Sequence, residues 1–186
     1  MIRLHCTKDL LKRLPLQANG RIRTPRHSRV AANDDDLETR LSGWHAKRLL
    51  IQRRQCLLFV HDATRFPVFV PAVLKAVFAA LDYHFSTSFM NTLLKTGADN
   101  ELMDRAQAAL APLVCDSVCD RSVQGTMNQM GQDLDYLFDD DRTPVNELTG
   151  YRQGAWLADR PCMVKGGKEC LWPKQAMRDF LLDQGH

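Results

Sequence analysis

The chain has 186 residues, of which 45% are hydrophobic and 25% charged, a balance typical of a soluble globular protein and not of a disordered one. The net charge of +3 is too small for the strong field that would by itself indicate a nucleic-acid-binding protein. No run is apolar enough for a secretion signal or a membrane span, so we expect a cytoplasmic protein without membrane contact, whose six cysteines are mostly reduced.

The beginning of the chain predicts a strand, a short helix and a charged loop. Residues 2–6 alternate apolar and polar side chains, as in a half-buried strand, and Thr7 is placed to cap a helix that Pro15 ends. Residues 15–43 contain few large apolar side chains and separate a group of arginines from a group of acidic residues. A loop of this length inside a compact domain is unusual, which indicates a functional segment or an insertion.

Residues 44–71 predict an antiparallel meander of three strands. The first strand covers about residues 44–52 and turns at Arg53 and Arg54. The continuous apolar run over residues 56–60 is typical of a central strand that is covered on both faces.

The rest of the meander follows from turn and proline chemistry. The sequence "HDAT" predicts the second turn, because Asp and Thr side chains bond to their own backbone. The third strand places Phe66, Val68 and Val70 on one face, and Pro67 predicts an edge position because it lacks a donor for the strand ladder.

From Pro71 to about residue 138 the pattern is mainly helical. Gly97 fits the end of one helix, and Asp99 fits the cap of the next. A third helix carries an apolar stripe at spacings of four and three: Val123, Met127, Met130, Leu134 and Leu137. The tail predicts a hairpin about residues 166–167 and a final helix with Pro173 in its first turn.

These elements together predict an α+β fold. We expect a small antiparallel sheet, made of the N-terminal strand and the 44–71 meander, packed by several helices and followed by a C-terminal hairpin and helix. The expected organisation is a single α+β domain over residues 1–141, with the charged loop at 15–43, and a C-terminal extension over residues 142–186 packed on it.

The sequence lacks the templates of the common enzyme classes: it has no phosphate-binding loop, no HExxH, no G-x-S-x-G and no CxxC. The enzymatic alternative is a small hydrolase or nuclease that uses His61 or His45 as a general base, with Arg121 and Asn128. The simpler interpretation of His61 and Asp62 is a turn with a histidine at the end of a strand.

Two further groups of residues suggest ligands. Nucleic-acid binding is an alternative function if the arginines of the charged loop converge with those of the first turn: Arg21, Arg23, Arg26 and Arg29 with Arg53 and Arg54. Cys115 and Cys119 have a spacing found in metal sites, but reduced thiols without a metal explain them more simply. We therefore predict no cofactor.

Four blocks of sequence carry a resemblance to a known family. They read "IRLHCTKDLLKRL", "WHAKRLLIQRRQCLLFVHDATRFPVFVP", "FMNTLLKTGAD" and "CDRSVQGTMNQM". Together they resemble an uncharacterised bacterial family, the domain of unknown function numbered six-nine-three-three, over about residues 1–138 except the 15–43 loop. The resemblance implies a small intracellular bacterial protein and brings no established activity. The positions that it marks as kept are Trp44-His45, Arg53-Arg54, Arg121-Ser122, and Gly125 to Asn128.

The expected function is that of a non-enzymatic binding module or regulator. It would engage a protein partner, as an accessory of a larger complex or of a defence or mobile-element system. The missing catalytic templates and an apolar-rich sheet with an exposed edge favour this hypothesis. The candidate binding residues are Arg53, Arg54, Trp44, Phe69 and Ser122. The oligomeric state does not follow from the sequence.

Overall fold

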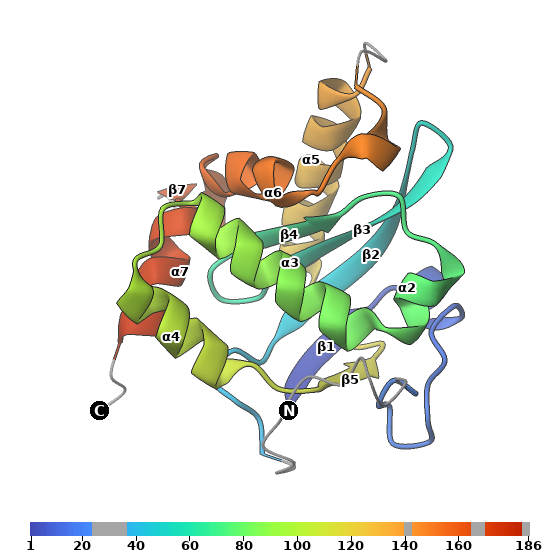
Figure 1. The fold of residues 1–186 in the computed structure, drawn as a ribbon, viewed down its shortest axis with the longest axis horizontal. Helices are drawn as coiled ribbons and strands as arrows, with labels where there is room; N and C mark the ends of the chain where they lie inside the picture. The colour runs from blue at the N-terminus through green and yellow to red at the C-terminus, as the bar shows by residue number, and fades with distance from the viewer. Residues whose placement is uncertain (24–36, 140–142, 165–169, 184–186) are drawn as a thin grey trace.

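The computed structural model describes residues 1–23, 37–139, 143–164 and 170–183, in which one five-stranded sheet lies between helices (Figure 1). In chain order the elements are β1 (Ile2–Cys6), α1 (Lys8–Leu11), β2 (Trp44–Ile51), β3 (Arg54–His61), β4 (Pro67–Val70), α2 (Lys75–Ala79), α3 (Leu81–Lys95), α4 (Asn100–Ala109), β5 (Leu113–Asp116), α5 (Arg121–Leu137), η2 (Val145–Glu147), α6 (Tyr151–Ala158), β6 (Cys162–Met163), β7 (Cys170–Leu171) and α7 (Pro173–Leu182). The α+β fold with a C-terminal hairpin and helix is confirmed.

The predicted meander is present. β2 pairs antiparallel with β3, with Arg48 opposite Leu57, and β3 pairs antiparallel with β4. The sheet order is β4-β3-β2-β1-β5, so β4 lies at the edge, where Pro67 can be accommodated.

The prediction of a purely antiparallel sheet is wrong. β1 lies between β2 and β5 and is parallel to both, with Leu4 opposite Trp44 on one side and Cys115 on the other. Alternating hydrophobicity in the sequence reports which face of a strand is buried, and carries no information on the direction of its neighbours. β5 itself was not predicted, because four residues after Pro112 give too short a pattern.

Two hydrophobic cores cover the two faces of the sheet. α3 crosses in front of the sheet and buries Phe85 and Phe89 against Trp44 and Phe59, whereas α5 lies behind it (Figure 1). β3 contributes to both cores, with Phe59 in the first and Leu58 in the second, as expected of a covered central strand.

The apolar stripe of α5 is confirmed except at its last position. Val123, Met127, Met130 and Leu134 are buried. Leu137 is 40% exposed, and Phe138 enters the core in its place. The reason is that α5 ends at Leu137, so Phe138 has left helical geometry and stacks on Phe69.

The C-terminal segment contributes to both cores. Val145 and Leu157 join the core behind the sheet, and Met177 and Leu181 join the one in front. Pro173 begins α7, and β6 pairs antiparallel with β7, as predicted. The tip of that hairpin, at residues 166–167, lies outside the described residues. None of the helices in the described ranges combines the length and apolar content needed to cross a membrane.

Candidate functional site

The four candidate catalytic residues do not meet in one site. His61 is buried on the same face of the sheet as Trp44 and contacts the rings of Trp44 and Phe180. Burial lowers the pKa of His61 to about 4. His45 lies on the opposite face, and Asn128, well along α5, accepts a hydrogen bond from Lys47 Nζ at 3.0 Å. Arg121 is exposed at the start of α5.

Two of the candidate binding residues are inside the protein. Trp44 is fully buried, and its Nε1 donates a hydrogen bond to the carbonyl of Leu41. Phe69 is also fully buried and stacks on Phe138, so the expectation that it is available to a partner is wrong. The position of β4 at the edge of the sheet suggested exposure, but both faces of this strand are covered.

The remaining candidates lie apart from one another. Arg53 and Arg54 are exposed at the β2–β3 turn, and Ser122 Oγ accepts a hydrogen bond from Arg65 Nη2 at 3.3 Å. Arg21 bridges to Val114 beside β5. The other loop arginines are Arg23, which is exposed, and Arg26 and Arg29, which lie outside the described residues.

Cys115 and Cys119 do not share a site. Cys115 is buried, whereas Cys119 is exposed. A hydrogen bond with Cys6, together with burial, raises the pKa of the Cys115 thiol. Among the residues that the structure describes, no group of three or more His, Cys, Asp or Glu side chains is arranged to hold a metal ion.

The structure brings together a cluster of histidines and carboxylates that the sequence did not reveal. His5 Nδ1 donates to Asp116 Oδ1, and His45 Nδ1 donates to Asp62 Oδ1, each at 2.6 Å. The Asp120 amide donates to His45 Nε2 at 2.8 Å. The His45 proton must therefore lie on Nδ1, and neither ring nitrogen of His45 is available to a substrate.

This cluster ties distant segments of the chain together. His5 comes from β1 and its partner Asp116 from the end of β5, 111 positions away. His45 joins β2 to Asp62 after β3 and to Asp120, the N-cap of α5. The pattern of hydrophobicity places His5 and His45 on one face, but only the unpredicted parallel pairing of β1 makes them neighbours.

Replacing His45 with alanine should lower the free energy of unfolding by about 2 kcal/mol, because it removes the hydrogen bonds that its buried ring makes with the Asp120 amide and with Asp62 Oδ1. Urea denaturation measures the loss. His84→Ala is the control, since His84 is half-buried and its ring packs against Tyr83 without a side-chain hydrogen bond to any described residue. Equal losses in the two variants would show that the cluster does not stabilise the fold.

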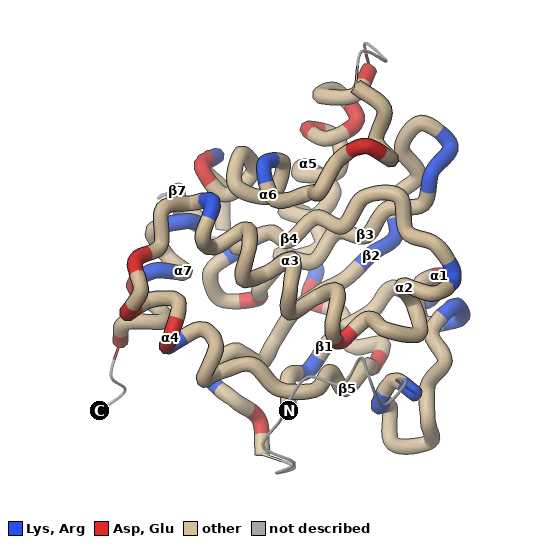
Figure 2. The backbone as a smooth tube through the Cα atoms, viewed as in Figure 1, with Lys and Arg blue, Asp and Glu red and all other residues tan. Residues whose placement is uncertain are grey.

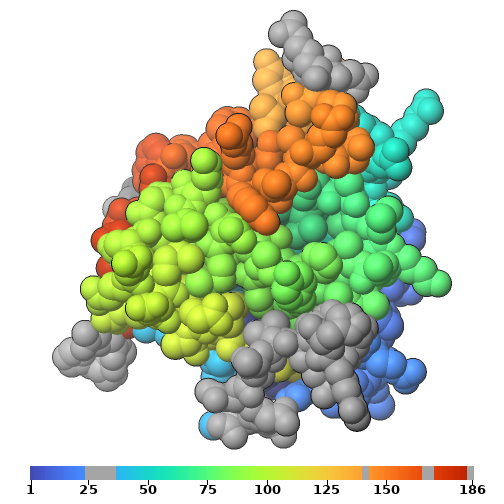
Figure 3. Space-filling view, viewed as in Figure 1, coloured from blue at the N-terminus to red at the C-terminus, as the bar shows by residue number. Residues whose placement is uncertain are grey.

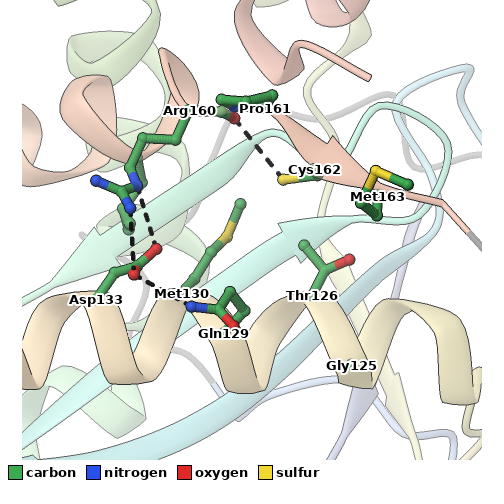
Figure 4. Close-up of a pocket in the computed structure, with 10 residues that line it drawn as sticks. Gly125, Thr126, Gln129, Met130, Asp133, Arg160, Pro161, Cys162 and Met163 are labelled. Carbon is green, nitrogen blue, oxygen red and sulfur yellow. Dashed lines mark hydrogen bonds and ion pairs between the residues drawn. The ribbon is translucent and has the colours of Figure 1, made fainter. Parts of the chain in front are cut away.

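A pocket lies between α5 and the residues that follow α6 (Figure 4). Its volume is about 390 Å³. The buried side chains of Met130 and Leu157 form part of its lining, and Met163 at its rim is 64% exposed. The other lining residues are Gly125, Thr126, Gln129, Asp133, Arg160, Pro161 and Cys162.

An ion pair closes one side of this pocket. Arg160 Nε lies 3.2 Å from Asp133 Oδ2, and Gln129 Nε2 donates to Asp133 Oδ1 at 3.3 Å. The Arg160 guanidinium also lies over the ring of Trp156, 4.7 Å from its centre. The pocket thus combines an apolar base with a fixed polar side, as small-ligand and anchor-residue pockets do.

α5 contains two glycines, and close packing accounts for only one of them. A Cβ at Gly131 would lie 3.2 Å from Lys47 Nζ and 3.4 Å from Leu49 Cδ2, so close packing against β2 favours glycine there. A Cβ at Gly125 would meet nothing within 4 Å. Glycine in a helix interior costs roughly 1 kcal/mol relative to alanine. At Gly125 packing gives no compensation, and the consequence of the glycine is a more open pocket.

Arg65 contacts Ser122 near the start of α5 and is unusual in three respects. Only 6% of its surface is exposed, and its backbone is left-handed with φ of 58°. Its Nε and Nη1 atoms are buried and have no hydrogen-bond partner in the described part of the chain. Two buried guanidinium nitrogens without a hydrogen-bond partner and a left-handed backbone both lower stability, so packing alone does not explain this residue.

Comparison with known proteins gives one match. The family model described as "Domain of unknown function (DUF6933)" matches residues 3–176. No significant match exists among curated proteins or among solved structures. The matched range includes the cluster of histidines and carboxylates and every residue that lines the pocket. Because the model covers most of its length, the chain belongs to the DUF6933 family.

Proposed function

We propose that this protein is a binding module that captures a partner protein by receiving an apolar side chain of the partner in the pocket between α5 and residues 160–163. The observation that carries this proposal is Gly125, whose missing side chain leaves the pocket wall open at a cost in helix stability. The volume of about 390 Å³ lies at the lower end of the range for binding pockets, roughly 300–1,000 Å³.

Exposed apolar residues beside the pocket favour a protein partner over a free small molecule. Met163 at the rim is 64% exposed. Trp172, which is 53% exposed, follows Leu171, the residue paired with Cys162 in the short hairpin. Methionine and tryptophan are enriched in the buried centres of protein interfaces, and their contact area extends beyond what a small ligand needs. The ion pair of Asp133 and Arg160 then belongs to the polar rim.

The enzymatic alternative receives no support from the residues first considered for it. His61 is in the core, and both ring nitrogens of His45 are engaged. General acid–base catalysis needs its groups within hydrogen-bond reach of one reacting atom, and these residues do not converge.

Filling the pocket tests the proposal. A library of random displayed peptides is selected on the wild-type protein, and the selected peptides are titrated against Gly125→Trp. The tryptophan should occupy the opening and weaken binding by roughly 30-fold or more, a change of about 2 kcal/mol. A Cβ at this position meets nothing within 4 Å, so the backbone of α5 has room for a side chain there. Isothermal titration calorimetry gives the affinities.

Gly125→Ala is the matched control. It removes the helix glycine but adds only a methyl group, so it should leave peptide affinity within about threefold and raise the melting temperature. Peptides that bind Gly125→Trp as tightly as the wild type would contradict the proposal. A library that yields no binder sensitive to this position would contradict it as well.

A further inference from the structure

The small net charge conceals a separation of charge along the chain. Residues 1–75 contain fifteen Lys and Arg against six Asp and Glu, whereas residues 76–186 contain ten against sixteen. The net charge of the first part is therefore +9 and that of the second part −6. A protein with this asymmetry can present a strong local field even though its total charge is only +3.

Part of this positive charge lies in one region of the surface, around the β2–β3 hairpin, α1 and the start of α2. We call it the basic face and define it by five exposed residues: Lys8, Lys12, Arg53, Arg54 and Lys75. Figure 2 shows Lys and Arg at the hairpin and at α1 along the right side of the molecule. No ion pair is formed by any of the five with another described residue.

Contacts within the fold hold these segments next to one another. Arg48 Nε of β2 lies 2.6 Å from Asp9 Oδ2 of α1, and the Val73 amide donates to the carbonyl of Gln55, the residue after Arg54. Asp9 is the carboxylate of α1, and Arg48 and Arg13 both pair with it. Because Asp9 is paired with these two arginines, its negative charge does not cancel the positive charge of the five residues of the basic face.

The hairpin has a backbone that its sequence does not favour. Gln52 and Arg53, the two residues of the turn, have φ values of 46° and 62°. Two-residue turns of this kind prefer Asn and Gly, because other residues cost roughly 1–2 kcal/mol each in the left-handed region. Gln52 is anchored by its side chain, which accepts from the Val145 amide at 2.8 Å and donates to the carbonyl of Thr143 at 3.3 Å.

Arg53 has no such anchor. Its side chain is exposed and forms no hydrogen bond or ion pair with the described residues, although its backbone has the same unfavourable conformation. In the space-filling view the hairpin forms a turquoise projection beyond the body of the protein (Figure 3). A strained, projecting and unpaired arginine indicates a role outside the fold.

We propose that the basic face binds the phosphate backbone of duplex DNA, with the tip of the β2–β3 hairpin at a groove. Arginine binds phosphate oxygens through two parallel hydrogen bonds, and lysine supplies point charges along the backbone. A two-stranded ribbon fits the major groove, which is about 12 Å wide. Contacts of this kind position a protein on DNA without selecting a sequence.

Salt dependence is the primary test. The full-length protein is titrated into a fluorescein-labelled duplex of roughly 20 base pairs, and anisotropy is recorded between about 50 and 200 mM KCl. With four or five phosphates neutralised, a plot of log Kd against log salt concentration should have a slope of about 4. Absence of binding at the lowest salt, or a slope near zero, overturns the proposal.

Charge-matched variants localise the contact. Arg53→Gln with Arg54→Gln should weaken binding by about tenfold or more and reduce the slope by about 2. Lys95→Gln with Arg152→Gln removes the same charge from exposed positions outside the basic face and should change affinity by less than about threefold. Equal effects of the two pairs overturn the proposal. Tighter binding to polyglutamate, or to vesicles of anionic lipid, than to DNA also overturns it.

Arg53→Gly separates binding from folding. Glycine adopts the left-handed conformation without strain, so the melting temperature should not fall, while DNA affinity should fall about threefold or more. An unchanged affinity shows that the hairpin tip does not touch DNA and overturns its assigned place. None of these variants alters the pocket beside α5, so they test DNA binding independently of partner capture.

Discussion

Replacing Gly150 with alanine is expected to lower the free energy of unfolding by about 4 kcal/mol or more, which is a large part of the stability of an ordinary domain. Gly150 is the N-cap of α6 and has a φ of 84°. A Cβ there would lie 2.8 Å from Pro71 Cδ and well inside van der Waals contact with the carbonyl oxygen of Phe69. The close approach of α6 to β4 therefore depends on the missing side chain.

Gly97→Ala provides the matched control for this variant. Gly97 follows α3 and has a φ of 90°, but a Cβ there would meet nothing within 4 Å. The control should lose only the cost of left-handed backbone, about 1–2 kcal/mol. Urea denaturation of both variants isolates the steric term as the difference between them. Equal losses would mean that α6 can move away from β4 without cost.

Acidification from pH 6.5 to 4 should remove about 3 kcal/mol of stability through His61. Burial lowers the pKa of this histidine from 6.5 to about 4, because its charged form would lie among Trp44 and Phe180. The unfolded chain binds a proton at higher pH than the folded chain does. The stabilisation from neutral His61 is therefore complete above pH 6.5. It is lost as the pH falls from 6.5 to about 4, at about 1.4 kcal/mol per pH unit.

His61→Phe tests this assignment, since phenylalanine keeps an aromatic ring against Trp44 and Phe180 but cannot bind a proton. The variant loses the hydrogen bond with Thr64 and should be less stable than the wild type at pH 7. Its free energy of unfolding should depend less steeply on pH between 6.5 and 4, as measured by urea denaturation at a series of pH values. A slope equal to that of the wild type would assign the pH dependence to other groups.

The sequence predicts most of the strands and helices because their signals are local. The alternation over residues 2–6 and the stripe of α5 as far as Leu134 each report one buried face, and the continuous apolar run over residues 56–60 reports two; the structure confirms them. Strand direction depends on which segments meet in space, so the parallel placement of β1 could not be predicted. The neighbouring His5 and Asp116, which need that placement, could not be predicted either.

The sequence does not predict α6, and the reason is a different one. It has only eight residues, and its interior contains Gly154, a poor helix former. A Cβ at Gly154 would lie 2.9 Å from Thr92 Cγ2, so the glycine lets α6 approach α3. Tertiary packing therefore forms this helix, and local preference does not. The pocket could not be predicted from the sequence either, because one of its walls follows α6 and the other is the face of α5 around Gly125.

The central position of β1 has a consequence for the order of folding. β2 and β3 are joined by a two-residue turn and can pair as soon as both have been synthesised, in microseconds once free in solution. β1 is synthesised before the other four strands of its sheet, but its pairing with β5 closes a loop of more than a hundred residues, as the 111 positions between His5 and Asp116 show. Loop closure of this length disfavours early contact. β1 is therefore expected to be among the last of the five strands to acquire both neighbours, and its apolar face stays open to aggregation until β5 has been synthesised.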